Sequence, residues 1–270
     1  VNQLIFVYNL AIFGAVSAAS IFGAQYFGKG NHKGHMYSFR FKLYATLFVT
    51  GGAILLFLTK GSALISLYLT DTVGNGATDV ALKYGQEYLA IMMVGLIPFA
   101  VNQSYATNIK ETGQTFIPML ASFVAVGTNA LLDYLMIFGI GPFPKMGVAG
   151  AALATILSQV VSAVLVMFTL CRSPQVYRVQ LKKIRFYGDM FNLIIRIGLP
   201  AGLQSVMYSI SNLIIQATLN GFGTDTMAAY TAYGKIDGMY WMVINAFGVA
   251  ITTFVGQNFG ARLYDRMKKS

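Results

Sequence analysis

Long uncharged windows, separated by short polar segments, recur along the whole chain. A helix needs about 20 apolar residues to cross about 30 Å of hydrocarbon, whereas barrel strands would alternate apolar and polar residues over about ten positions. The continuity of the windows favours helices, and only the fourth contains a charge, Asp133. The second is short, and we expect the side-chain stems of Arg40 and Lys42 to reach the interface there. The predicted transmembrane helices are 4–27, 43–58, 88–109, 116–138, 148–171, 197–219 and 238–259.

Composition and charge both support an all-α polytopic membrane protein. Hydrophobic residues make up 56% of the chain and charged residues only 10%, against about a quarter in soluble domains. Of the 19 Lys and Arg residues, 14 fall beside one set of loops and three beside the other. Because loops rich in Lys and Arg stay in the cytoplasm, the chain is predicted to begin outside the cell. The net charge of +10 then reflects orientation and contact with anionic lipid, and we expect no nucleic-acid partner.

A short motif occurs twice, 232 residues apart. The stretch FGAQYFGKG begins at Phe22 and FVGQNFGAR begins at Phe254, and six of the twenty positions from 9 to 28 are identical at this offset. Both windows run in the same direction and end at basic residues, which predicts a parallel repeat about an axis along the membrane normal. With no initiator Met, and an apolar window at the very start, we expect a longer parent with an earlier helix. The predicted domains are a first lobe lacking its first helix (1–171), a basic cytoplasmic linker (172–190) and the start of a second six-helix lobe (191–270).

The order and spacing of several stretches resemble the multidrug and toxic compound extrusion (MATE) transporters. These stretches are GAQYFGKG, KETGQTFIPML, NALLDYLMIFGIGPFPKMGVAGAALAT, GLPAGLQS and AAYTAYGKIDGMYWMVINAFGVAITTFVGQNFGA. The resemblance covers essentially all 270 residues, as helices two to eight of the family's twelve. It implies two pseudo-symmetric six-helix lobes around a cavity that faces either side alternately. It also implies that organic, often cationic, compounds leave in exchange for sodium ions or protons.

Asp133 is the one acid in the interior of a predicted span, six residues before Gly139 and therefore in the outer part of the bilayer. A carboxylate there is costly in hydrocarbon, so it should face a cavity, bind a cation or become protonated. Asn129 lies four residues earlier on the same helical face and can supply an amide oxygen. Two interpretations stay open: the pair serves ion coupling or cavity polarity, or Asp133 tethers a neighbouring helix end.

A polar stripe follows the sixth window at steps of four residues, formed by Gln204, Tyr208, Asn212 and Gln216. Steps of four drift only about 40° around a helix, so all four side chains can line one side. Interhelical hydrogen bonding would account for such a stripe, but four large polar groups exceed what tight packing needs, so we prefer a cavity wall. Asn245 in the last window is a weaker candidate of the same kind. One branch of the resembled family has an acid near the Tyr208 position, and its absence here leaves the coupling ion open.

Other chemistries lack their sequence signatures. GKGNHKG does not have the spacing of a phosphate loop and no H-E-x-x-H motif occurs, so we expect no enzyme and no cofactor beyond the coupling sodium ion or proton. His32 and His35 lie in a predicted loop with Gly and Lys neighbours, which we interpret as solvated and not as a metal site.

The resulting hypothesis is a secondary active multidrug exporter in a bacterial plasma membrane, with its basic loops in the cytoplasm. Its predicted partners are membrane lipid and small organic substrates, and we expect a monomer. One alternative is a lipid-linked oligosaccharide flippase of the same superfamily, for which a more cationic cavity is expected. The other is a seven-helix receptor or scaffold, which has no need of two parallel repeats.

Overall fold

The computed structural model describes residues 1–66, 75–172 and 224–269, together with single positions between 192 and 219. Every regular element in these ranges is a helix, and six of the helices are long and apolar enough to cross a membrane. The prediction of an all-α polytopic membrane protein is therefore confirmed. The helices are α1 (Asn2–Gly28), α2 (His32–Ser66), α3 (Asn75–Glu111), α4 (Phe116–Phe138), α5 (Val148–Arg172), α7 (Thr224–Gly260) and α8 (Tyr264–Met267).

The bounds of two helices match the predicted windows to within one residue. α4 has the predicted bounds, and α5 ends one residue after the predicted position. α2 begins at His32 instead of 43 and α7 at Thr224 instead of 238, because both helices include charged residues that the windows left out. The predicted linker 172–190 and helix 197–219 lie almost entirely outside the described residues.

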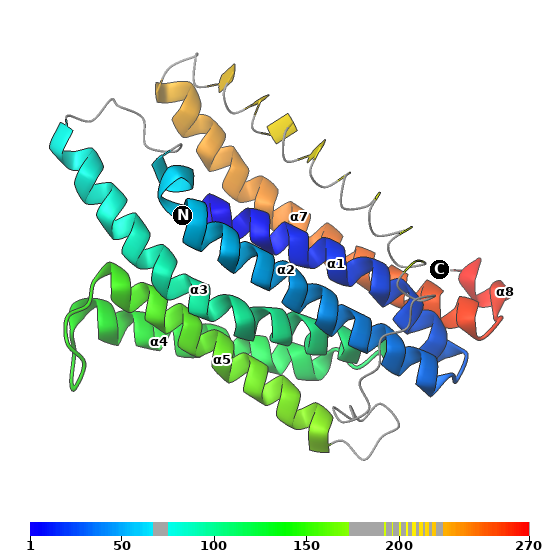
Figure 1. Cartoon of the computed structure of the whole chain (residues 1–270). Coiled ribbons are helices and arrows are strands. Elements are labelled where there is room, and N and C mark those ends of the chain that lie inside the picture. Colours follow the sequence, from blue (N-terminus) through cyan, green and yellow to red (C-terminus); the bar gives the residue numbers. More distant parts are fainter. Residues whose placement is uncertain are drawn as a thin grey trace.

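The long helices run up and down between two ends of a bundle (Figure 1). We call the end where α1, α3 and α7 finish the basic end, because Lys29, Lys110 and Arg262 lie there, and the opposite end the far end. α2 packs on α1 and α3, and α5 packs on α3 and α4. α7 lies alongside α1 and runs in the same direction (Figure 1). The parallel course of these two helices agrees with the repeat found in the sequence.

An apolar core forms where α1, α2 and α3 meet. Ile12 of α1, Phe57 of α2 and Leu96 of α3 are all buried in it. The Tyr8 hydroxyl donates to the Leu96 carbonyl oxygen at 3.0 Å and lies 2.9 Å from the Thr50 hydroxyl oxygen. Polar groups between membrane helices contribute to association when they find partners on a neighbouring helix, as this tyrosine does.

Small residues allow α5 to approach its neighbours closely. A Cβ atom on Gly150 of α5 would lie 2.8 Å from the carbonyl oxygen of Met136 on α4. A Cβ atom on Gly95 of α3 would lie 2.7 Å from Cγ1 of Ile156 on α5. Both distances are shorter than van der Waals contact, so these crossings require glycine.

A buried ion pair joins α2 to α3 at the basic end. The Lys42 Nζ atom lies 2.5 Å from the Glu111 Oε1 atom, and the two side chains are 0% and 2% exposed. The expectation that Arg40 and Lys42 extend to the interface is wrong, because α2 begins ten residues before Lys42 and packs this segment against α1 and α3. The predicted solvated position of His35 is wrong for the same reason: the residue is 1% exposed, and its Nδ1 atom lies 3.0 Å from the Gly23 carbonyl oxygen.

We expect Lys42→Met to destabilise the fold by about 3–5 kcal/mol, because it leaves the Glu111 carboxylate buried without a counter-charge. Replacing both charges, in Lys42→Met with Glu111→Met, should cost less than the single substitution, since no charge is then left in the interior. The measurement is thermal unfolding of the purified protein in detergent. Lys60→Met, at an exposed position of the same helix, is the matched control. A Lys42→Met protein as stable as this control would contradict the prediction.

Candidate functional site

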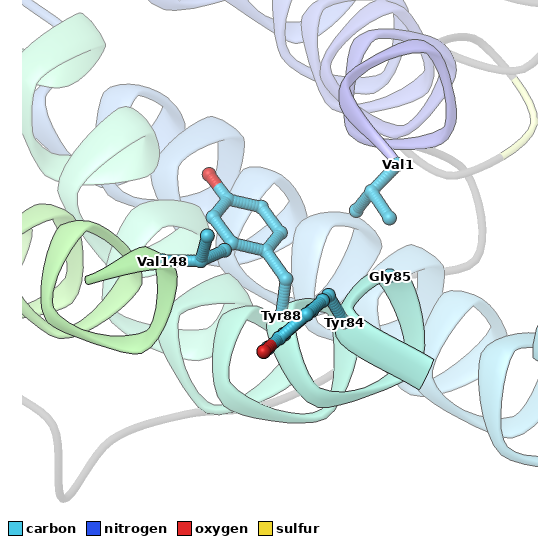
Figure 2. A pocket seen from close by; sticks show the side chains of 5 residues that line it. All are labelled: Val1, Tyr84, Gly85, Tyr88 and Val148. Atoms are coloured by element: carbon cyan, nitrogen blue, oxygen red, sulfur yellow. The ribbon is translucent and has the colours of Figure 1, made fainter. Parts of the chain in front are cut away.

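A cavity of about 300 Å³ opens at the far end of the bundle. Val1 at the start of the chain, Tyr84, Gly85 and Tyr88 of α3, and Val148 at the start of α5 line it. Figure 2 shows the Tyr88 ring lying between Val148 and Val1. The cavity thus combines two phenols with apolar surface, a composition suited to organic ligands.

Asp133 of α4 lies within electrostatic reach of this cavity but is not among its lining residues. The Asp133 carboxylate interacts electrostatically with Tyr88, one of the lining residues. Both Asp133 Oδ1 and Asn129 Nδ2 are buried and have no hydrogen-bond partner in this conformation. Because a buried carboxylate oxygen is costly without a partner, Asp133 is a candidate to bind a cation or a proton, whereas the unpartnered Asn129 atom is a donor and cannot ligate one. The alternative role predicted for Asp133, a tether to a helix end, gains no hydrogen bond in support within the described residues.

The predicted polar stripe lies apart from Asp133. Gln204, Tyr208 and Asn212 are exposed, and the Tyr208 ring lies 6.3 Å from the Trp241 ring of α7 in an edge-to-face arrangement. Gln216 is outside the described residues. None of the three described members borders the cavity at Tyr88. Their role as a cavity wall stays a prediction.

The Asn245 side chain makes its hydrogen bond within its own helix. Its Nδ2 atom donates to the Trp241 carbonyl oxygen, one turn earlier in α7, at 3.0 Å. The side chain is exposed and does not border the cavity at Tyr88. The role of Asn245 in lining a substrate cavity also stays a prediction.

A polar network that the sequence did not predict surrounds Glu111 at the basic end. Besides the ion pair with Lys42, the Glu111 Oε2 atom lies 3.9 Å from the His35 Nδ1 atom. A Cβ atom on Gly23 of α1 would overlap the same carboxylate, so only glycine fits there. Gln257 of α7 donates from Nε2 to the Glu111 backbone oxygen at 2.6 Å. Four helices therefore meet at one acidic residue.

The sequence signal for this network was present but ambiguous. Lys42 and Glu111 border apolar windows at the same end of the bundle, and each has a basic neighbour, Arg40 or Lys110. Such residues ordinarily lie in headgroup water, so a charge at the edge of a window does not by itself predict a buried partner. The pairing of opposite charges on consecutive helices at one depth is the feature that can identify such a network.

The two copies of the repeated motif pack against each other reciprocally. A Cβ atom on Gly28 of α1 would overlap the Gln257 carbonyl oxygen, and one on Gly260 of α7 would overlap the Gln25 carbonyl oxygen. Gly28 and Gly260 are equivalent at the 232-residue offset, and so are Gln25 and Gln257. The two contacts are therefore the same contact seen from each repeat, as expected at a two-fold axis.

Comparisons with known proteins agree with this architecture. The chain matches the MatE family model over residues 1–135 and 200–270. It is 27% identical over 261 residues to the probable multidrug resistance protein NorM of Thermotoga maritima, covering 96% of this chain and 54% of that protein. It is 26% identical over 198 residues to the probable multidrug resistance protein YoeA of Bacillus subtilis, covering 72% and 42%. Its identity to the FAD transporter of Shewanella oneidensis is 27% over 195 residues, covering 72% and 43%. The chain spans about half the length of these relatives.

Solved structures share the fold. A crystal structure of MATE in the bent conformation matches with a TM-score of 0.85 at 21% identity, covering 99% of this chain and 58% of that one. An outward-facing MATE family transporter gives 0.85 at 21% identity, covering 99% and 57%. An inward-facing MATE family transporter gives 0.70 at 21% identity, covering 98% and 58%. Because the family model matches more than half of the chain, the chain belongs to the MatE family of multidrug and toxic compound extrusion transporters.

Proposed function

We propose that this chain works in a secondary active exporter, which exchanges organic, often cationic, compounds for sodium ions or protons by alternating access. The observation that supports it most directly is the buried, unpartnered Asp133 oxygen beside the cavity at Tyr88. The relatives named above are transporters and not enzymes, in keeping with a function in transport.

A single carboxylate in this position is enough to couple two cations. In hydrocarbon the ionised Asp133 side chain needs a counter-charge, which a sodium ion, a proton or a cationic substrate can supply. Because these compete for one group, the arrival of one favours the departure of another. The gradient of the coupling ion can then drive substrate outward, provided that each binds the two conformations with different affinity.

Alternating access is supported by where α1 and α7 touch. Their close contacts lie at the basic end, at Gly28, Gly256 and Gly260, while the most apolar stretch of α7 contains no buried residue. Structures of the same fold are titled as outward-facing and as inward-facing, which is the pair of states that this mechanism requires. A contact between repeats that is confined to one end lets the repeats separate at the other end, and the opposite state requires this contact to open in turn.

The cavity does not favour the flippase alternative. The buried cations of the described residues, Lys42 and Arg40, lie at the basic end, and neither borders the cavity at Tyr88. Lys42 is neutralised by Glu111. Because the named relatives include multidrug proteins and an FAD transporter, a substrate panel should contain organic cations and a flavin dinucleotide.

We expect Asp133→Asn to lower gradient-driven transport by about tenfold or more, because it removes the charge for which ion and substrate compete. The measurement follows a fluorescent organic cation in proteoliposomes containing the full-length protein, under an imposed sodium or proton gradient. Asp265→Asn, at an exposed acid on α8, removes the same charge elsewhere and should leave transport unchanged. Transport that survives Asp133→Asn would assign this residue to structure. No movement of any panel member by the unmodified protein, under either gradient, would contradict the proposed exporter.

Orientation follows from the asymmetry of positive charge, and we expect the basic end to lie in the cytoplasm of a bacterial cell. Cysteines introduced as Lys33→Cys and Lys145→Cys, each in a Cys171→Ser background, test it because both lysines are exposed, at opposite ends of the bundle. In intact cells a membrane-impermeant maleimide should label the cysteine at 145 and spare the one at 33. Permeabilised cells are the control, in which both should react. The reverse labelling pattern would invert the proposed topology.

A further inference from the structure

We propose that Gln257 and the glycine crossing of α1 with α7 form a latch between the two repeats at the basic end, positioned by the Lys42–Glu111 ion pair. The role of this latch in transport rests on the proposed function. In that role the latch closes the basic end, and it must open before substrate can enter or leave there. Its existence as a conformational lock can be tested separately from transport.

The hydrogen bond of the latch completes the end of a helix. α3 ends at Glu111, so the Glu111 carbonyl is among the last four of the helix and has no partner within it. Gln257 of α7 supplies the missing donor at 2.6 Å, in a part-buried position where water competes poorly. The second repeat therefore caps a helix of the first, and separation of the repeats leaves that carbonyl without its donor.

The ion pair fixes the acceptor. The Glu111 side chain is bound by Lys42 of α2, and Gly23 of α1 packs so closely on its carboxylate that no Cβ fits between them. The side chain of Glu111 is thus held by two helices of the first repeat while its backbone oxygen faces the second. Lys42 and Glu111 are positioning residues. Their ion pair holds the end of α3 in place, and with it the carbonyl oxygen that accepts from Gln257.

The glycine crossing sets the distance over which Gln257 must reach. α7 approaches α1 until Gly28 meets the Gln257 carbonyl and Gly260 meets the Gln25 carbonyl. Gly256 also packs against Ala24, where an added Cβ would lie 2.9 Å from the alanine Cβ. A methyl group at Gly28 or Gly260 has no space in this conformation. It would separate the helices and withdraw Gln257 from α3.

Buried polar atoms beside the latch indicate that this end has a second arrangement. Arg40 Nε, His35 Nε2 and both side-chain amide atoms of Asn108 are buried and have no hydrogen-bond partner in this conformation. Buried polar groups are normally satisfied, and exceptions concentrate where a structure stores strain or moves. Rearrangement of α1 and α7 at the basic end would give these groups access to water or to new partners.

The test measures the distance across the basic end by electron spin resonance of paired spin labels. Labels are placed at Lys33→Cys and Asp265→Cys, both exposed, in the full-length Cys171→Ser protein in lipid nanodiscs. Gly28→Ala and Gln257→Leu should each move the distribution toward longer distances, with the closed-to-open ratio falling about fivefold for the loss of one hydrogen bond. Gln257→Glu, which keeps the shape but loses the donating amide when ionised, should behave like Gln257→Leu.

Matched controls come from the same helix. An added methyl in Gly248→Ala meets no atom within 4 Å, and the Thr252 hydroxyl bonds only its own helix, at the Gly248 carbonyl. Gly248→Ala and Thr252→Val should therefore leave the distribution unchanged. Closed distributions for Gly28→Ala, Gln257→Leu and Gln257→Glu alike would overturn the latch.

A second label pair separates positioning from general stability. Glu111→Gln should lengthen the distance across the basic end but leave unchanged a pair at Lys60→Cys and Lys145→Cys, exposed at the far end of the first repeat. Broadening of both distances would show that Glu111 serves stability alone and would overturn its positioning role. Because the distances are read without substrate, a latch that opens as expected in a protein that transports nothing would refute the proposed exporter and not the latch.

Discussion

The structure depends most on the cost of placing a charge inside a bundle that has little water to solvate it. An unpaired buried charge costs several kcal/mol even after relaxation, so it must be neutralised or given a ligand. At the basic end Lys42 and Glu111 neutralise each other at 2.5 Å. That pairing allows α2 to continue through its basic residues and holds the Glu111 carboxylate in the space that a Cβ atom at Gly23 of α1 would occupy.

The same cost has a different outcome at the far end. Each acid has one buried oxygen without a hydrogen-bond partner, Glu111 Oε2 and Asp133 Oδ1, but among the described residues Asp133 has no cation within ion-pair distance, as Glu111 has in Lys42. A charge that is paired inside the protein contributes to architecture, because its partner cannot leave. A charge left for an external partner can exchange that partner, which is the elementary requirement of coupled transport. In the proposed exporter, Glu111 and Asp133 are therefore two solutions to one physical problem.

Much of the fold followed from the sequence because hydrocarbon thickness imposes a length on each helix. α4 and α5 were predicted nearly to the residue, since Gly139 and the polar segment after it end one apolar run before the next begins. The start of α2 was missed because Lys42 looked like an interfacial residue, and its counter-charge lies 69 positions away. Asp133 stood out as an isolated charge within a span, whereas Glu111 did not, since a charge at the edge of a window is ordinarily solvated. The cavity could not be predicted, because three separate segments of the chain line it.

The repeat explains why the motif occurs twice in the sequence. Two equivalent helices that cross about a two-fold axis meet at the same residue from each side, so one steric requirement falls on both copies. Here the requirement is a missing Cβ against a neighbouring carbonyl, met by Gly28 in one copy and Gly260 in the other. A hydrogen bond crosses the same interface, from Gln257 of the second repeat to the carbonyl oxygen at the end of α3 in the first. Because Gln257 provides both the carbonyl that meets Gly28 and the amide that reaches α3, the steric contact and the hydrogen bond depend on the same approach of the two helices.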